Sequence, residues 1–215
     1  GQVRGESMAV RNMSDSQSML KVADGALDST HSVLQRMREL SIQANNGLLT
    51  SSDRQSLQNE FNQLRETIDS IGKNTQFNTK PLLDGSLNQM NTTTGANGKS
   101  VSISLDSALS SQLGDSKSGV SIADIDLVNH PQMSLRAIDE AIQAVSGNRG
   151  KIGAMDNRLD HSINNSRNAE LNQLAAESRI RDADMAKSAM ELQKFKVMQE
   201  TYFAVQRMGM DMMGM

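Results

Sequence analysis

Residues 34–83 read LQRMRELSIQANNGLLTSSDRQSLQNEFNQLRETIDSIGKNTQFNTKPLL, which contains the end of one helix, a polar break and a second helix. From Met19 to Leu40, which is near the start of this segment, mostly apolar residues recur at steps of three and four. This spacing places them on one stripe of a helix. The stripe comprises Met19, Val22, Ala23, Ala26, Leu27, Thr30, Val33, Leu34, Met37 and Leu40. We predict a first helix over residues 2–45, about 65 Å long at roughly 1.5 Å per residue. Gly25 within it marks either a close helix-helix approach or a tolerated surface position.

The polar break separates the two helices. Asn and Gly at residues 45–47 tolerate the left-handed conformation that ends helices. Ser52 and Gln55 have the spacing of a capping box, which predicts a second helix over residues 52–73. Its apolar residues step by four and three, as in a short coiled-coil seam, and are Leu57, Phe61, Leu64, Ile68 and Ile71. The short break implies that this helix packs antiparallel against the first.

The region between the helical arms has a different pattern. Residues 89–100 are polar and contain glycine, as is typical of a loop or a hairpin tip. Val101, Ile103 and Leu105 then alternate with serine, which is the period of a half-buried strand. We therefore expect a small β-hairpin element within residues 84–133.

A third helix follows this region. Pro131 is a residue of a turn or a first helical turn, and Ser134 is a candidate cap. From Leu135 onward apolar residues recur with the helical period, and the helix is expected to run past Ala175. It contains three closely spaced glycines, which are Gly147, Gly150 and Gly153. Because glycine weakens an isolated helix, we expect packing against the first two helices to hold this one.

The C-terminal stretch, residues 185–215, is predicted to be an amphipathic helix. Its apolar stripe comprises Leu192, Phe195, Met198, Tyr202, Val205 and Met208. Such a face needs a partner, because an exposed apolar stripe favours association. Residues 208–215 are rich in methionine, whose thioether suits copper(I). No cysteine or histidine lies nearby, so no metal site is expected there.

Composition indicates an elongated helical protein. Of the 215 residues 37% are hydrophobic and only 2% are aromatic, whereas a compact enzyme core uses more aromatic side chains. The net charge of −3 comes with no basic patch, which argues against nucleic-acid binding. Cysteine is absent, and no apolar run of 18 residues could cross a membrane.

Catalytic motifs are not recognised in the sequence. His31, His130 and His161 occur in no HExxH or HxxxH pair, and we expect all three at the surface. Asp182 and Asp184 are two residues apart on a predicted helix and would point in different directions. We therefore predict no enzyme activity and no cofactor.

Four segments closely resemble those of bacterial flagellins, in the same order along the chain. They are LQRMRELSIQAN at 34–45, NTQFNTKPLLDG at 74–85, AMDNRL at 154–159 and AAESRIRDADMA at 175–186. The resemblance implies a mainly α, elongated antiparallel rod of long coiled-coil-like helices with a small β-hairpin. It implies a secreted structural subunit of the extracellular flagellar filament, which self-associates and is not an enzyme.

This resemblance divides the chain into four parts. Residues 1–83 would be the N-terminal helical arm of the rod, and residues 84–133 a short variable region with the hairpin. Residues 134–184 would be the C-terminal arm, and residues 185–215 a tail helix like that of the filament's inner shell.

The resemblance also implies a contact surface for Toll-like receptor five at Arg36, Leu40, Gln43 and Glu60. Arg36 would offer a planar hydrogen-bonding fork, Leu40 an apolar anchor and Gln43 a neutral polar group. The residues alone also fit another interpretation, in which Arg36 pairs with Glu39 or Glu60 and Leu40 continues the core stripe. The same surface packs subunits in flagellin filaments, so assembly can be its first role.

The tail carries the remaining expected contacts. Flagellins present this segment to an export chaperone, and Leu192, Phe195, Met198, Tyr202 and Val205 would bind that partner as a helix in a groove. The family's N-terminal inner-shell segment would precede Gly1, so the chain as given is not expected to polymerise alone. Residues 199–215 also depart from the family pattern. The alternatives are a hook-filament junction protein and a non-polymerising secreted helical binding module.

Overall fold

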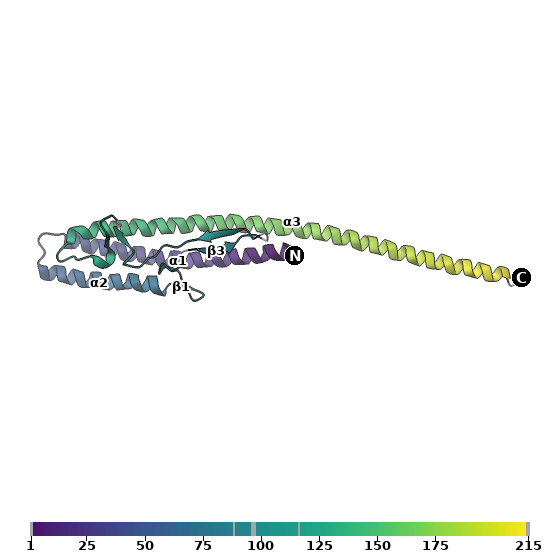
Figure 1. The fold of residues 1–215 in the computed structure, drawn as a ribbon, viewed down its shortest axis with the longest axis horizontal. Coiled ribbons are helices and arrows are strands. Elements are labelled where there is room, and N and C mark those ends of the chain that lie inside the picture. The colour runs from purple at the N-terminus through teal and green to yellow at the C-terminus, as the bar shows by residue number, and fades with distance from the viewer. Residues whose placement is uncertain (1, 88, 96–97, 116, 214–215) are drawn as a thin grey trace.

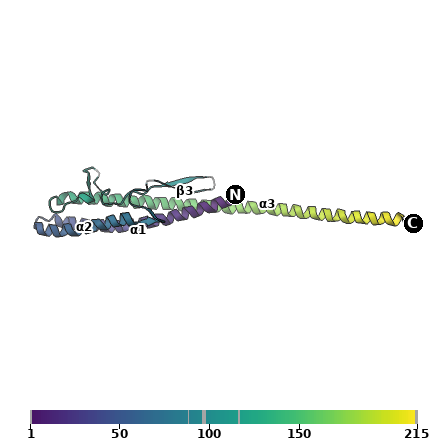
Figure 2. The same ribbon diagram turned by 60° about the horizontal axis from the view of Figure 1, so that its bottom comes forward.

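Three long helices dominate the fold. The computed structural model describes residues 2–87, 89–95, 98–115 and 117–213, with the backbone alone at 206 and 208–213. Its helices are α1 (Gln2–Ala44), α2 (Ser51–Asn74) and α3 (Pro131–Met213), joined by short strands and one 3-10 turn. The chain forms a narrow rod, and α3 continues far beyond the N-terminal end of α1 (Figure 1, Figure 2). The mainly α antiparallel rod expected from the sequence is confirmed.

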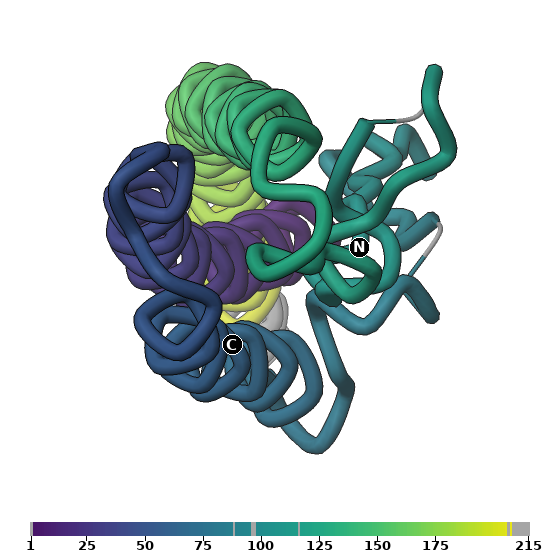
Figure 3. Tube along the Cα trace, turned by 90° about the vertical axis from the view of Figure 1, so that its left-hand side faces the viewer, coloured from purple at the N-terminus to yellow at the C-terminus, as the bar shows by residue number. Residues whose placement is uncertain are grey.

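The core lies between α1 and its two neighbours. Viewed along the rod, α1 lies between α2 and α3, and the segment with the strands covers one side (Figure 3). The buried apolar residues of α1 are Ala9, Met13, Met19, Leu20, Ala23, Leu27, Leu34, Met37, Leu40 and Ala44. Those of α3 are Ala137, Ile138, Ala141, Val145, Ile152, Leu159 and Ile163. The predicted stripe of α1 is confirmed except at Val22, which is exposed.

The caps of α2 and α3 differ from the predicted ones, although α1 and α2 start within one residue of the predicted positions. Thr50 caps α2, because its hydroxyl accepts a hydrogen bond from the Asp53 amide and Asp53 accepts one from the Thr50 amide. The prediction of Ser52 with Gln55 was therefore wrong by two residues, since a threonine and an aspartate fill the same pattern earlier. The prediction that Ser134 caps α3 was also wrong. The helix begins at Pro131, and the Ser134 hydroxyl donates to the Pro131 carbonyl from within the first turn.

At one tip of the rod, hydrogen bonds of the polar break hold the ends of the three helices together. Asn45 follows the last residue of α1, and its side-chain amide donates to the carbonyls of both Ser41 and Pro131, each at 2.8 Å. The end of α1 and the start of α3 are thereby tied together. Arg54 of α2 donates to the Ala44 carbonyl at 3.1 Å, which ties α2 to the same point.

Three two-stranded antiparallel sheets occur in the described residues. They are β1 (Gln76–Phe77) with β2 (Lys80–Pro81), β3 (Met90–Thr93) with β4 (Ser100–Ile103), and β5 (Gly114–Asp115) with β6 (Val120–Ser121). The predicted hairpin is β3–β4, in which Thr92 lies opposite Val101. The buried Thr92 hydroxyl lies 2.7 Å from that of Ser16 and so fixes the hairpin to α1.

The β5–β6 pair depends on one glycine. Gly114 has φ +151°, a conformation that residues with a side chain rarely adopt. A Cβ atom at this position would collide with the carbonyl oxygen of Val120 and with the backbone of Ser121. Gly114 is therefore required for the close pairing of the two strands, which sequence reasoning did not identify.

Helix α3 runs without a break through residues 184 and 185, so its rod-like part and its tail are one continuous helix. The last buried side chain described on it is Ser166, and the last partly buried one is Gln173. Beyond that point all described side chains are exposed. At roughly 1.5 Å per residue the 83 residues of α3 span about 125 Å.

Gly147, Gly150 and Gly153 allow a test of the helix itself. They are exposed, and no atom lies within 4 Å of a Cβ built on any of them. The triple variant Gly147→Ala, Gly150→Ala, Gly153→Ala should raise the free energy of unfolding by about 2–3 kcal/mol, because alanine is favoured over glycine in a helix. Urea denaturation followed by circular dichroism measures the change. Gly114→Ala is the contrasting variant, and we expect it to lower the stability.

Candidate functional site

The first candidate surface is an ion-pair cluster between α1 and α2. The Arg36 guanidinium donates through Nε and Nη2 to one Glu60 carboxylate oxygen at 2.9 and 2.7 Å, and through Nη1 to Glu39 at 2.9 Å. The hydrogen bonds that Arg36 donates to Glu39 and then to Glu60 are the main causes that raise its pKa. About half of the Arg36 side chain stays exposed, so solvent screens these pairs and their contribution to stability is small. The cluster presents an ordered charged surface.

The structure places the four predicted receptor-contact residues at different depths. Arg36 and Glu60 are brought together from two helices, and Gln43 is exposed further along α1. Leu40 has only 1% of its surface exposed and belongs to the core. The expectation of Leu40 as a surface anchor is therefore not supported. The step of three or four residues that carries the core stripe through Leu34, Met37 and Leu40 turns this side chain inward.

Sequence reasoning missed the ion pairs that join α1 to α3. Arg149 contacts Asp24 at 2.9 Å and Asp28 at 2.6 Å, and the hydrogen bond that it donates to Asp24 is the main cause of its raised pKa. Asp24 and Asp28 are four residues apart, so they occupy one helical face. That spacing was the available signal, but the partner more than 100 positions away was not predictable from it.

Asp115 is a buried carboxylate that fixes the β5–β6 hairpin to α3. It accepts hydrogen bonds from the Ser118 hydroxyl at 2.7 Å and the Lys117 amide at 2.8 Å. Its charged partner is Arg136 of α3, whose Nε lies 3.0 Å away. The Ser118 hydrogen bond is the largest contribution that lowers the pKa of Asp115 to about 2. The ionised form is therefore the one that the fold stabilises.

This arrangement predicts a pH dependence of stability. A carboxyl pKa depressed in the folded state contributes stability that is complete above the unfolded value of about 4 and is lost as pH falls to about 2. Asp115→Asn should therefore lower the melting temperature at neutral pH. The variant should also lose less stability than the parent protein between pH 4 and pH 2, because it has no carboxyl group to protonate at this position. Thermal melts across this range test it, with Asp182→Asn of the exposed tail as the control. If the melting temperatures of Asp115→Asn and the parent protein fell equally between pH 4 and pH 2, the prediction would be contradicted.

The second candidate surface is the tail stripe on α3. Phe195 and Tyr202 have 65% and 63% of their surfaces exposed, and Leu192, Met198 and Val205 are also exposed. Tyr202 also contacts the neighbouring Phe203 edge to face, with ring centroids 6.3 Å apart. The side chains of residues 208–213, which include Met208 and most of the methionine-rich end, lie outside the described residues. The described part is an unpartnered apolar face.

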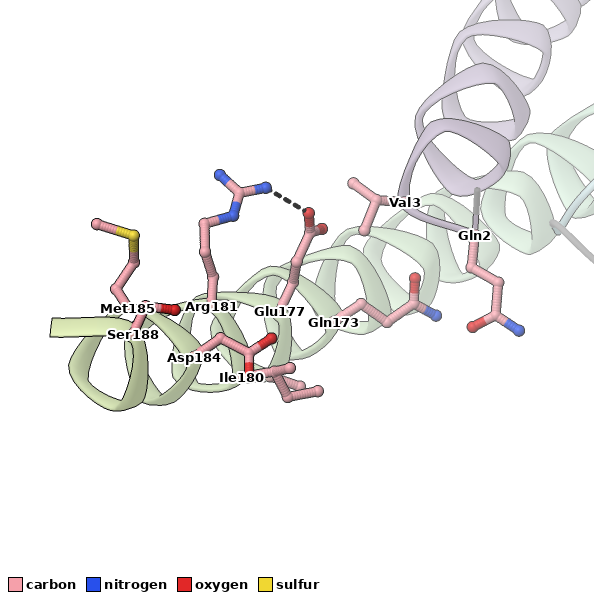
Figure 4. A pocket seen from close by; sticks show the side chains of 10 residues that line it. Gln2, Val3, Gln173, Glu177, Ile180, Arg181, Asp184, Met185 and Ser188 are labelled. Atoms are coloured by element: carbon pink, nitrogen blue, oxygen red, sulfur yellow. Dashed lines mark hydrogen bonds and ion pairs between the residues drawn. The ribbon is translucent and has the colours of Figure 1, made fainter. Parts of the chain in front are cut away.

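A groove lies beside the N-terminal first turn of α1, where the free part of α3 begins. It measures about 830 Å³ and is lined by Val3 of α1 and by Gln173, Ile180 and Met185 of α3, among others. Figure 4 shows Val3 on the first turn of α1 and the other labelled side chains of the groove along α3, with Arg181 paired to Glu177. The groove is open and mixed in polarity. It resembles a helix-packing surface more than an enclosed ligand site.

Other site classes find no support in the part of the chain that the structure describes. No group of three or more His, Cys, Asp or Glu residues there could hold a metal ion. His130 and His161 are exposed as expected, whereas His31 is half-buried, so that expectation was wrong for His31. Among the described residues, no helix is sufficiently long and apolar to cross a membrane.

A narrow helical rod that extends into an unpartnered amphipathic helix is the architecture of a subunit that assembles with other chains. Comparisons with known proteins specify the family. The model of the bacterial flagellin N-terminal helical region matches residues 1–88, and that of the C-terminal helical region matches residues 135–207. The chain belongs to the bacterial flagellin family. Membership of this family supports a structural role for the chain in the flagellar filament.

Individual relatives agree with this assignment. The chain is 42% identical to a flagellin of Halalkalibacterium halodurans over 93% of its own length and 72% of that protein's. It is 38% identical to a flagellin of Bacillus subtilis over 93% and 76% of the two chains. Among solved structures, Bacillus cereus flagellin is 31% identical with a TM-score of 0.60, covering 73% of this chain and 88% of that one. A flagellar hook-associated protein from Vibrio parahaemolyticus has a TM-score of 0.68 at 19% identity, covering 81% of this chain and 92% of that one. At this identity the likeness shows a shared fold alone.

Proposed function

We propose that this protein is a secreted structural subunit of a bacterial flagellar filament and that it associates with other copies through the α3 tail. The observation that carries the proposal is the continuity of α3 beyond the rod. Its described side chains after Gln173 are exposed, and an apolar stripe runs through Phe195 and Tyr202. Family membership supports the same role.

The proposed mechanism is burial of the tail stripe in helix-helix seams. Repeated contacts between identical subunits that do not close into a ring generate an open helical filament. The rod of α1, α2 and the first part of α3 then acts as a stiff spacer outside the tails. Its core and its ion pairs hold that spacer rigid, and no step of this mechanism requires catalysis or a cofactor.

Filament formation by the complete gene product tests the proposal. The gene is expressed in a bacterial strain that lacks its own flagellin, and the cells are examined by electron microscopy. Long filaments support the subunit role. Short structures at the hook would favour a hook-filament junction protein, and secreted protein without any structure would favour a non-polymerising binding module. Either of these two results would overturn the filament proposal.

We also propose a role for the α1–α2 surface as a ligand of Toll-like receptor five. Arg36 and Glu60 form an ordered, half-exposed pair, and Gln43 is exposed on the same helix as Arg36. Arginine in such a position is a frequent hot spot of protein interfaces. Leu40 has an indirect role, because its packing in the core fixes the position of α1, which presents Arg36 and Gln43. The same surface is available for subunit packing in the filament.

The second proposal is tested by measuring receptor signalling in cells that carry Toll-like receptor five and a reporter. Arg36→Ala should weaken signalling by about tenfold or more, as loss of an interface hot spot does. Arg158→Ala, which removes an exposed arginine from α3, is the matched control and should leave the signal unchanged. A response to Arg36→Ala equal to that of the control would contradict the receptor proposal while leaving the filament proposal intact.

Before export, we propose that a flagellar chaperone binds the tail. The exposed residues Leu192, Phe195, Met198, Tyr202 and Val205 form the apolar face of a helix-in-groove ligand. Calorimetric titration of the protein with the chaperone from the same bacterium tests this. Phe195→Asp should abolish the binding heat, and unchanged binding would reject the tail as the contact.

A further inference from the structure

The described methionines of this chain differ widely in exposure. The sequence contains 15 methionines and no cysteine, so an oxidant meets thioethers and no thiol. Met13 and Met37 are fully buried in the rod core. On the tail, in contrast, Met190 has 66% and Met198 has 49% of its surface exposed. Met8 and Met133, which lie outside the tail, are also exposed, at 54% and 52%. Oxidation of methionine to the sulfoxide follows accessibility, so the exposed methionines should react before the buried ones.

Met198 differs from Met190 in its position on the helix. It lies three residues after Phe195 and four before Tyr202, which places it within the apolar tail stripe. Met190 lies off that stripe. The thioether of methionine is apolar and adapts its shape to a packing partner. A sulfoxide adds a polar oxygen, and burying that oxygen without a hydrogen-bond donor is unfavourable.

We propose that Met198 is an oxidation site that controls tail association, so that its sulfoxide blocks assembly of the free subunit. This inference rests on the tail-mediated association proposed above. In the reaction, a peroxide O–O bond breaks and one oxygen forms a bond to the Met198 sulfur. The sulfur is oxidised by two electrons and hydrogen peroxide is reduced to water. A reductant of the methionine sulfoxide reductase type reverses the step.

Peptide mapping by mass spectrometry tests the chemical part. The complete, unassembled gene product is treated with hydrogen peroxide for increasing times. Met198 should be oxidised at least about ten times faster than Met13 or Met37, because the core methionines react only when the rod opens. Equal rates at Met198 and at the core positions would overturn the inference.

Assembly assays test the consequence, using four proteins measured with and without peroxide by sedimentation and electron microscopy. Met198→Gln, a polar mimic of the sulfoxide, should reduce assembly at least about tenfold, and the matched Met190→Gln should change it less than about twofold. Met198→Leu should assemble and should keep assembling after peroxide, whereas the parent protein should not.

The outcomes separate the two proposals. Failure of the untreated parent protein to assemble would refute the proposed function, and this inference with it. Assembly of a parent protein that is fully oxidised at Met198 would refute the oxidation site alone. Equal loss of assembly in Met198→Leu and the parent after peroxide would also refute it, since another group would then be responsible.

Discussion

Phe61→Ala should lower the free energy of unfolding of the rod by about 3–5 kcal/mol, the range for a buried aromatic truncated in a core. Phe61 is fully buried, and it is among the largest fully buried side chains described. Helix α2 has few other anchors, since its remaining buried residues are Ile68 and Gly72. Removing the ring therefore deprives α2 of a large part of its attachment to the core.

Urea denaturation followed by circular dichroism measures this change. Leu48→Ala is the matched control, because it also truncates an apolar side chain but at a position that is 90% exposed. It should change the free energy of unfolding by less than about 0.5 kcal/mol. Similar losses in the two variants would mean that α2 is not held by its buried face.

The attachment of α2 also involves polar contacts whose donor and acceptor groups Phe61→Ala does not remove. The Gln58 side chain accepts from the Leu127 amide at 2.7 Å, and Arg65 donates to the Ala123 carbonyl at 3.1 Å. These bonds hold the other side of α2 against the segment before α3. Because they depend on the helix staying in position, we expect them to weaken in the variant, which would place its loss toward the upper end of the range.

The helical framework was predictable because its signal is local. Steps of three and four residues placed Leu34, Met37 and Phe61 in the core, where the structure has them. Val22 satisfied the same spacing and is nevertheless exposed. Periodicity identifies a stripe, but the width of the neighbouring helix decides how much of its edge is covered.

The remaining features depend on contacts between residues that are distant in the sequence. Nothing near Asp115 indicates that Arg136 of α3 will lie beside it, and the strand pair that contains Asp115 is only two residues long on each side. The receptor surface shows the same limit. The sequence allowed Leu40 to be either an anchor or a core residue, and only the packing of α1 on its neighbours decided for the core.

The tail presents the opposite case, since its pattern is clear and its partner is not part of the fold. The double variant Phe195→Asp, Tyr202→Asp should fold as the parent protein does and should fail to assemble. Both side chains are more than 60% exposed, so the substitutions leave the rod core untouched. In a seam, the change removes two large apolar side chains, each worth roughly 1.5–3 kcal/mol when buried, and adds two charges that resist burial. A loss of about 4 kcal/mol corresponds to about a thousandfold weaker association.

The matched control is Ala186→Asp, Gln193→Asp, which adds the same two charges with the same spacing of seven residues. At about 100° per residue, these positions lie roughly opposite Phe195 and Tyr202 on the helix. Sedimentation assays with the complete gene product should show no polymer for the stripe variant and polymer for the control. Circular dichroism should give the same melting temperature for both. Equal inhibition by the two pairs would show that charge alone blocks assembly, and normal assembly by the stripe variant would show that the seam forms elsewhere. Loss confined to the stripe pair would instead locate the subunit contact on one face of α3, the apolar face that carries Phe195 and Tyr202.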